Sequence, residues 1–575
     1  MICAALLAAV VAAGGAEFHR LLDEEWEARL REEPLLASRT GDHRYDDRLP
    51  SVTPADLERS AERQRATLAR LKAIDRASLG TSDRISYDML ARELADDLTD
   101  YQFGAWRLPI NADSGFHTGL AELPRSTSFL TSRDYENYMT RLRVFPTYFG
   151  QQIANMREGI RTGFVQPRVV LEGYETTIRT HVVADPDESV FYAPFRTFPP
   201  GVPERDRARL VTEGRKAVME GVAAYRTFLD FMTGEYLPGC RASIGASELP
   251  RGREYYAYLV RHFTTLDVTP DEVHRIGLGE VERIRAEMLD VIGKVRFRGD
   301  FAAFLEFLRT DPRFYAKTPE ELLKNASFIA KKMDAKLPSL FGRLPRLPYG
   351  VEPVPAHLAP KYTGGRYVQA PIGGTRAGTY WVNTYALESR PFYTQEALTL
   401  HEAVPGHHLQ IALQQEMENV PPFRRAAGVG AFVEGWGLYS ERLGLESGFY
   451  QDPYSNFGRL TYEMWRACRL VVDTGMHAFG WTRERAMEFM ASNTALSLHE
   501  VRTETDRYIS WPGQALGYKM GELKIRELRK MAETELGQKF DVRAFHDAIL
   551  ANGPVPLPVL EEQIRAYVVE TKRRP

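Results

Sequence analysis

The chain has 575 residues, 44% of them hydrophobic and 26% charged, which suffices for a large buried core or several domains. Its formal net charge of −3 excludes the strongly basic surface by which many proteins attract nucleic acid or anionic membranes. Three cysteines are too few for a disulfide framework. We therefore expect a globular protein that binds no nucleic acid and has no stable insertion in a membrane. No feature of the sequence indicates the oligomeric state.

An apolar run opens the sequence. Residues 1–16 are mostly small or aliphatic and are followed at once by polar Glu17. The run is too short to span a bilayer, but it has the length of the hydrophobic part of a secretory signal peptide, although a positively charged start is missing. We predict a signal peptide at residues 1–16 and an exported protein, periplasmic or extracellular. If the run is a plain apolar helix, a cytoplasmic location follows.

Amphipathic helices are predicted along most of the remaining chain, because apolar residues recur every three to four positions. The clearest stretches are Glu17–Leu36, Pro54–Ile74, Ser132–Thr162, Glu204–Met232, Pro270–Val295 and Pro319–Leu337. Three of them start with a proline preceded by threonine, which is typical of a capped helix start. The pattern predicts a mainly α-helical protein with a soft division into an N-terminal half, residues 17–240, and a C-terminal half, residues 241–575.

The passage Leu398–Gln410 (LTLHEAVPGHHLQ) carries the most specific chemical signal. A histidine followed by a glutamate on an apolar helix opens the zincin motif, in which a second histidine four residues later shares the same face. Here the next histidines come six and seven residues after His401. On a straight helix the sixth residue points about 120° away and the seventh lies about 10.5 Å along the axis, so neither reaches a shared zinc.

Pro405 and Gly406 supply the missing distortion. Pro405 has no N–H to donate to the carbonyl of His401, and Gly406 tolerates backbone angles that other residues resist. Two residues can then bulge out and return a histidine to the required place. We predict that His401 and His407 bind zinc, with His408 as the substitute for His407.

A third ligand is expected from a following helix, because catalytic zinc takes three protein ligands and water. Glu434 stands in an otherwise apolar stretch, where an unpaired carboxylate would be costly to bury. We predict that it completes a site for one Zn²⁺ per chain. Glu441, seven residues later, can accept the free N–H of a ligand histidine or pair with Arg442 at the surface. Glu402, beside a metal-bound water, is the predicted general base.

A strand is predicted just upstream of the metal helix. Gly378–Thr384 is β-branched and aromatic, whereas the proline-rich Leu344–Pro371 before it is predicted to be irregular. In a small antiparallel sheet, the edge of such a strand can pair with an extended peptide. We predict Tyr380 and Asn383 as substrate contacts; a plain core strand is the alternative.

Three runs of sequence resemble a known family: HEAVPGHHLQ at 401–410, FVEGWGLYSERLG at 432–444 and RYISWPGQALGYK at 507–519. They look like the bacterial "domain of unknown function 885" family, which is similar to the gluzincin branch of metallopeptidases. The resemblance covers nearly all of the chain after residue 16. It implies a mostly α-helical zincin-like fold, a zinc cofactor and peptide hydrolysis. Since related gluzincins stabilise the oxyanion with late tyrosines, it also implies that role for Tyr508 and Tyr518.

The function predicted from these features is zinc-dependent hydrolysis of short peptides in a deep cleft between the helical halves. A zinc amidase or other hydrolase acting on a non-peptide substrate is one alternative. A metal-binding exported protein without activity is another, although a purely structural zinc has no need of an acid such as Glu402 beside its ligand. The sequence indicates neither the residues preferred beside the scissile bond nor an exo or endo mode.

Overall fold

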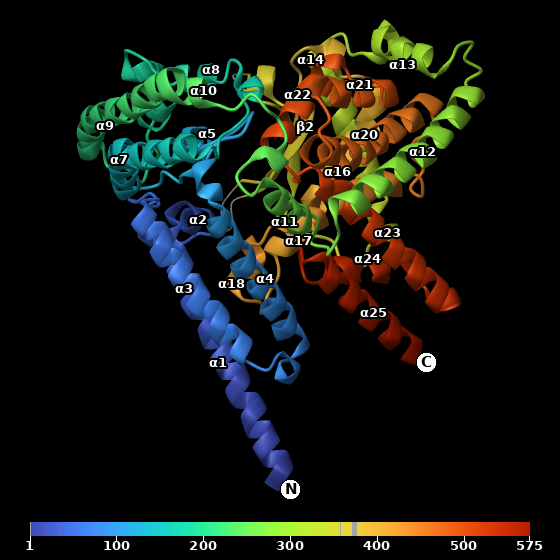
Figure 1. Ribbon diagram of the computed structural model, residues 1–575, viewed down its shortest axis with the longest axis horizontal. Helices are drawn as coiled ribbons and strands as arrows, with labels where there is room; N and C mark the ends of the chain where they lie inside the picture. Colours follow the sequence, from blue (N-terminus) through green and yellow to red (C-terminus); the bar gives the residue numbers. More distant parts are fainter. Residues whose placement is uncertain (1, 357, 371–375, 575) are drawn as a thin grey trace. The chain divides into compact units, whose positions relative to one another are not determined.

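The computed structural model describes residues 2–356, 358–370 and 376–574, and helices dominate among them, as the periodicity predicts (Figure 1). The chain divides into two compact units. One runs to Ser243 and takes in Glu248–Arg251; the other takes in Ile244–Ser247 and most of the chain from Gly252 on. This boundary lies close to the division drawn at residue 240. Among the described helices, none offers an uncharged apolar stretch that would reach across a lipid bilayer.

The first unit is an assembly of helices in which α7 and α9 pack along one another. Aromatic side chains fill the space between them, and Phe145, Tyr225 and Phe228 are fully buried there. The helix expected over 17–36 is divided, since Pro34 cannot donate the N–H that would continue it and begins a new helix. The α-helices of this unit are α1 Ile2–Glu32, α2 Pro34–Arg39, α3 Pro54–Ala73, α4 Thr81–Phe103, α5 Phe116–Ala121, α6 Leu123–Ser126, α7 Ser132–Thr162, α8 Glu175–Arg179, α9 Glu204–Phe231 and α10 Leu237–Gly239.

The second unit contains every residue predicted for the site. In it, α12 lies along α20 (Figure 1), and contacts also pack α23 against both α19 and α25. Its α-helices are α11 Gly252–Thr264, α12 Pro270–Lys294, α13 Phe301–Thr310, α14 Pro319–Asp334, α15 Leu337–Leu340, α16 Gln395–Glu402, α17 His407–Gln415, α18 Pro422–Ala426, α19 Gly430–Leu443, α20 Pro453–Ala478, α21 Arg483–Asn493, α22 Leu498–Ser510, α23 Leu516–Leu536, α24 Val542–Leu550 and α25 Leu557–Arg573.

Threonine caps fix three of the helix starts. The side chain of Thr269 accepts the backbone N–H of Glu272, the third residue of α12, and Thr53 and Thr318 cap α3 and α14 in the same way. Each cap satisfies an N–H that has no partner within the helix, and the proline that follows the threonine has no N–H to satisfy. The starts predicted at residues 54, 270 and 319 are confirmed.

A small three-stranded sheet lies beside the helix that carries His401. Its strands are β1 Tyr349–Pro353, β2 Gly365–Val368 and β3 Gly378–Val382, in the order β1-β3-β2. The strand predicted from residue 378 is confirmed, but the sheet is mixed: β1 pairs with β3 in parallel and β2 pairs with it antiparallel. The prediction of a wholly antiparallel sheet is therefore wrong, as is an irregular conformation throughout residues 344–371.

The sheet and α16 share one hydrophobic cluster. Tyr380 and Val382, on one face of β3, pack with Leu322 and Ala326 of α14 and with Ala403, which follows α16. Alternation along β3 buries this face, as expected for a strand packed on helices. The cluster holds the end of α16 against the sheet, and the candidate metal ligands lie at that end.

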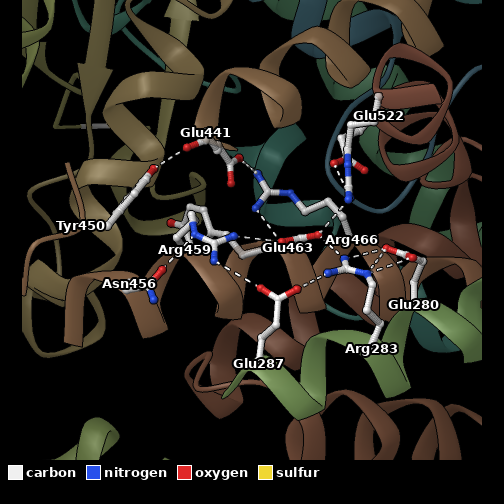
Figure 2. A network of polar contacts seen from close by, with 12 residues as sticks. Glu280, Arg283, Glu287, Glu441, Tyr450, Asn456, Arg459, Glu463, Arg466 and Glu522 are labelled. Atoms are coloured by element: carbon white, nitrogen blue, oxygen red, sulfur yellow. Dashed lines mark hydrogen bonds and ion pairs between the residues drawn. The ribbon is translucent and has the colours of Figure 1, made fainter. Parts of the chain in front are cut away.

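A buried group of charges joins α12, α20 and α23 (Figure 2). Lys519 on α23 is fully buried, and its Nζ lies 2.9 Å from Glu280, 3.0 Å from Glu463 and 2.9 Å from Glu522. Arg283 contacts both Glu280 and Glu463. Each of these three carboxylates thus contacts at least one cation.

We expect Lys519→Met to lower the free energy of unfolding by about 3–5 kcal/mol, because it removes a fully buried counter-charge that three carboxylates share. Urea denaturation followed by circular dichroism measures this change. The matched control is Lys530→Met, which removes an exposed lysine from the same helix. Equal unfolding midpoints for the two variants would show that the buried group contributes little.

Candidate metal centre

The helix that begins with Gln395 breaks directly after Glu402. Four residues, 403–406, separate α16 from α17, which begins at His407. Gly406 donates its N–H to the carbonyl of Leu400 at 3.0 Å, so the chain folds back on the last turn of α16. A Cβ at Gly406 would clash with the backbone carbonyl of His401, so only glycine allows this close approach. The break thereby returns His407 to the side of His401.

The structure brings the three predicted ligands together. Single donor atoms of His401, His407 and Glu434 all lie within 4.8 Å of one another. Oε2 of Glu434 lies 3.4 Å from Nε2 of His401 and 3.5 Å from Nε2 of His407. Donors bound to tetrahedral zinc at 2.0–2.1 Å are about 3.3–3.4 Å apart, whereas N–H···O hydrogen bonds are usually shorter, about 2.7–3.2 Å. The spacing therefore fits the edges of a zinc tetrahedron.

The charges at this site are strongly coupled. Burial raises the pKa of Glu434, but the two imidazoles outweigh this effect and hold the pKa well below its ordinary value. Burial also opposes protonation of His401, but the nearby carboxylates of Glu434 and Glu441 raise the pKa of His401 to about 9. Binding of a cation to these atoms would therefore be coupled to the release of a proton.

Glu441 supports His401 from behind. Its Oε1 lies 3.1 Å from Nη2 of Arg466 (Figure 2). The same oxygen lies 2.9 Å from Nδ1 of His401, and the carboxylate is buried. This is the place predicted for a partner of a ligand histidine, and it leaves Nε2 of His401 for a metal. The alternative, a surface pair with Arg442, does not fit a residue that is 1% exposed.

His408 is held away from the other donors. Its Nδ1 lies 3.0 Å from the hydroxyl of Tyr367 on β2, and burial lowers the pKa of His408 to about 4. The neutral ring packs against Tyr349 and Tyr367. The structure therefore favours His407 over His408 as the second nitrogen ligand.

Glu402 lies at the end of α16 beside the sheet. Its Oε2 accepts the backbone N–H of Tyr367 at 2.7 Å, which fixes the carboxylate at the edge of β2. Next to Tyr367 on the strand stands Arg366. Desolvation lowers the pKa of Arg366, but Tyr362 and then Glu402 outweigh this effect and raise the pKa. Tyr518 makes a smaller contribution in the same direction. A cation thus lies near the predicted base. Sequence reasoning missed it, since no pattern marks an arginine in this segment.

The two side chains predicted to contact substrate are occupied in the interior. Tyr380 is fully buried, with its hydroxyl 3.4 Å from that of Thr399. The amide of Asn383 donates to the carbonyls of residues 359, 362 and 363, and so ties the loop before β2 to β3. In addition, β3 is the central strand, so both of its edges are paired and neither can receive a peptide. These side chains have structural roles in place of the predicted one.

The two late tyrosines differ. The hydroxyl of Tyr508 accepts from Trp465 and Arg469 and donates its proton to Glu504 at 2.8 Å, so it has none to offer an oxyanion. The role implied for Tyr508 therefore gives way to a structural one. Tyr518 is half-buried, and its hydroxyl accepts a long hydrogen bond of 3.5 Å from Arg507. Its own proton remains to be donated, so the oxyanion role stays a prediction for Tyr518.

Gly437, which was not predicted from the sequence as a site residue, leaves room for the ring of His401. A Cβ at Gly437 on α19 would lie 2.6 Å from Cε1 and 2.8 Å from Nε2 of His401. We expect Gly437→Ala to displace this ring and weaken zinc binding by roughly 10–100-fold, the range known for loss of a supporting partner. Competition with a chelator measures the affinity. Gly430→Ala on the same helix, where a Cβ meets nothing within 4 Å, is the control and should bind zinc normally.

Comparison with known proteins places the chain in a family. The sequence profile described as "Bacterial protein of unknown function (DUF885)" matches residues 34–564. The chain belongs to this family. None of the curated proteins matches it. All of the residues discussed for the metal centre fall within the DUF885 region.

Two solved structures resemble this DUF885 protein along nearly its whole length. One is the crystal structure of "the putative lipoprotein from Colwellia psychrerythraea", with 27% identity, a TM-score of 0.88, and coverage of 96% of this chain and 99% of the other. The second is "a putative lipoprotein of unknown function from Shewanella oneidensis", with 19% identity, a TM-score of 0.72, and coverage of 95% and 99%. At this identity the second likeness shows the fold alone.

Proposed function

We propose that this protein is a zinc-dependent hydrolase of peptide bonds, with His401, His407 and Glu434 as ligands of one Zn²⁺ and Glu402 as the general base. The observation that carries the proposal is the spacing of the three donors, 3.4 and 3.5 Å along two edges, in a buried site. A donor set of two imidazoles and one carboxylate that leaves a position for water is typical of catalytic zinc.

The order of these residues also supports a zincin-like arrangement of the gluzincin kind. A histidine and the adjacent glutamate end one helix, a second histidine begins the next, and a glutamate from a later helix completes the set. The spacing differs from the common motif by two residues, and the break at 403–406 absorbs this difference.

Zinc in this site would lower the pKa of a bound water to about 7. In this proposal Glu402 would accept the proton of that water and return it to the leaving amine. The backbone N–H of Tyr367 holds one carboxylate oxygen of Glu402, so the orientation of the base depends on β2. Arg366 and Tyr518 are the nearby groups that could stabilise an oxyanion, one by charge and one by a hydroxyl proton.

The edge of β2 favours a peptide over other amides. This strand pairs with β3 on one side only, and it lies beside Glu402. An extended peptide can bond the main-chain groups of this edge other than the N–H of Tyr367, which Glu402 occupies, and this brings a scissile bond near the base. The strand that we expect to align substrate is thus β2 and not β3. A deep cleft between the halves stays a prediction.

Export of the protein is part of the proposal. The Colwellia protein, similar over nearly its whole length, is described as a "putative lipoprotein", which supports a periplasmic or extracellular location for this chain. Cell fractionation of the native host with an antibody against the protein tests it. Recovery in the cytoplasmic fraction would contradict export without affecting the proposed chemistry.

Digestion of a mixed peptide library, read by mass spectrometry, tests the activity. We expect cleavage by the zinc-loaded protein, loss of cleavage after chelation, and recovery when zinc is returned. Cleavage of simple amides but of no peptide would favour the amidase alternative. Zinc bound at one ion per chain with no cleavage of either substrate class would favour a non-catalytic metal-binding protein.

A further inference from the structure

A cavity of about 280 Å³ lies one helical turn before Glu402. Gln395 and Leu398 of α16 line it, and Glu402 follows Leu398 by four residues on the same face of the helix. Gly364, which immediately precedes β2, lines it as well. The cavity is thus next to the proposed base and the substrate-aligning edge. It is slightly smaller than cavities that enclose drug-sized ligands, about 300–1,000 Å³, so its size suits one side chain.

Glu306 and Glu388 line this cavity but are exposed to solvent, and most of its other polar side chains already have partners. Gln395 uses both ends of its amide, accepting from Asn325 and donating to the carbonyl of Leu322. Asn383 donates to loop carbonyls, and Arg309 donates to three carbonyls of residues 491–496. These groups stabilise the walls and have little capacity left for a ligand.

Arg390 and Glu500 are different. Arg390 makes one long hydrogen bond of 3.4 Å, to the carbonyl of Tyr362, and its buried Nε has no hydrogen-bond partner. Within the part of the chain that the structure describes, the Glu500 carboxylate forms no ion pair or hydrogen bond, although both residues line the cavity. Burial raises the pKa of Glu500 even though Arg390 opposes the shift. The same cavity is thus bordered by a hydrogen-bond donor without an acceptor, Nε of Arg390, and by an acceptor without a donor, the Glu500 carboxylate.

Charge and shape together select the occupant. A cation could bind Glu500 but would be repelled by Arg390. An anion could bind Arg390 but would be repelled by Glu500. A neutral group that both accepts and donates can satisfy both walls, since a carboxamide offers an oxygen to a guanidinium and an N–H₂ to a carboxylate. Leu398, Val382 and Leu496 provide apolar surface for the methylene groups beside it.

We propose that this cavity is a specificity subsite that binds a glutamine or asparagine side chain of the peptide substrate through Arg390 and Glu500. The proposal rests on the function proposed above and names the substrate class of the same site. Satisfying these two half-buried charged groups should give a preference of about tenfold or more over a side chain of similar size without the amide.

Binding of short peptides to zinc-loaded Glu402→Gln tests this subsite without requiring turnover. The probes are acetyl-Ala-Ala-Xaa-Ala-Ala-amide peptides in which Xaa is Gln, Met, Glu or Lys, with affinities measured by calorimetry. We expect the Gln peptide to bind about tenfold more tightly than the Met peptide. Added to this background, Arg390→Met should remove that preference and favour Lys, whereas Glu500→Gln should remove it and favour Glu. Arg343→Met, which changes an exposed arginine outside the cavity, is the control.

The two proposals fail in different ways. Equal affinity for the Gln and Met peptides, or a preference for Gln that survives both substitutions, would overturn the subsite. Tighter binding of Lys or of Glu by the unsubstituted cavity would overturn it too, because one charge alone would then select the ligand. The absence of cleavage of any library peptide by the wild-type protein would overturn the proposed activity instead.

Discussion

Glu402→Gln should abolish peptide hydrolysis while leaving zinc bound. Glu402 ends α16, next to His401, and its Oε2 is held by the backbone N–H of Tyr367. A glutamine at this place keeps the size of the side chain but cannot accept the proton of a metal-bound water. General acid–base catalysis contributes about 10²–10⁴-fold, so we expect kcat to fall by at least that factor. Peptide cleavage and zinc content are measured on the same preparation.

The matched control for this substitution is Glu418→Gln, which changes an exposed glutamate shortly after α17. It should retain both full activity and one zinc per chain. If Glu402→Gln cleaved peptides as fast as the wild type, Glu402 could not be the base. If it lost its zinc instead, its carboxylate would have to be part of the ligand set.

His407→Gln should lose zinc, whereas His408→Gln should keep it. The two histidines are neighbours at the start of α17, but Nε2 of His407 lies 3.5 Å from Glu434 while Nδ1 of His408 lies 3.0 Å from the Tyr367 hydroxyl. Loss of a ligand should cost more than the roughly 10–100-fold known for loss of a ligand's hydrogen-bond partner. Chelator competition gives the two zinc affinities.

Because the two substitutions are identical in chemistry and adjacent in position, each serves as the control of the other. Thermal unfolding of both variants after chelation shows whether either is simply misfolded. The reverse result, zinc lost from His408→Gln and kept by His407→Gln, would require the break between α16 and α17 to have a different conformation from the one observed.

Local signals in the sequence predicted the helices well. The threonine–proline pairs marked the starts of α3, α12 and α14, since a cap depends only on the residues beside it. The sheet was harder. β1 and β2 lie in a proline-rich segment without alternation, and they become strands because β3, more distant in sequence, pairs with both. Strand order and direction are properties of that pairing and could not be predicted from one strand.

In the candidate site, too, features set by neighbouring residues could be predicted and features set by distant contacts could not. His401, Glu402 and the break at Pro405 and Gly406 could be predicted, because the required spacing of two zinc ligands forces a distortion there. The choice between His407 and His408 could not, as it depends on Tyr367 in a distant strand.

Side-chain contacts, one local and one with another helix, distinguish the two late tyrosines. Tyr508 and Tyr518 are alike in sequence, but Glu504 takes the hydroxyl proton of Tyr508, and Arg469 on another helix also occupies that hydroxyl. Gly437 was missed for the opposite reason. Gly437 matters because the ring of His401 occupies the place where a Cβ would lie, and this contact is visible only in three dimensions.

Anomalous diffraction at the zinc edge, on crystals of the zinc-loaded protein, is the most direct measurement of the ligand set. We predict one peak per chain, about 2.0–2.2 Å from Nε2 of His401, Nε2 of His407 and a carboxylate oxygen of Glu434. A peak elsewhere in the chain, or no peak after loading with one equivalent of zinc, would contradict the assignment of these three residues.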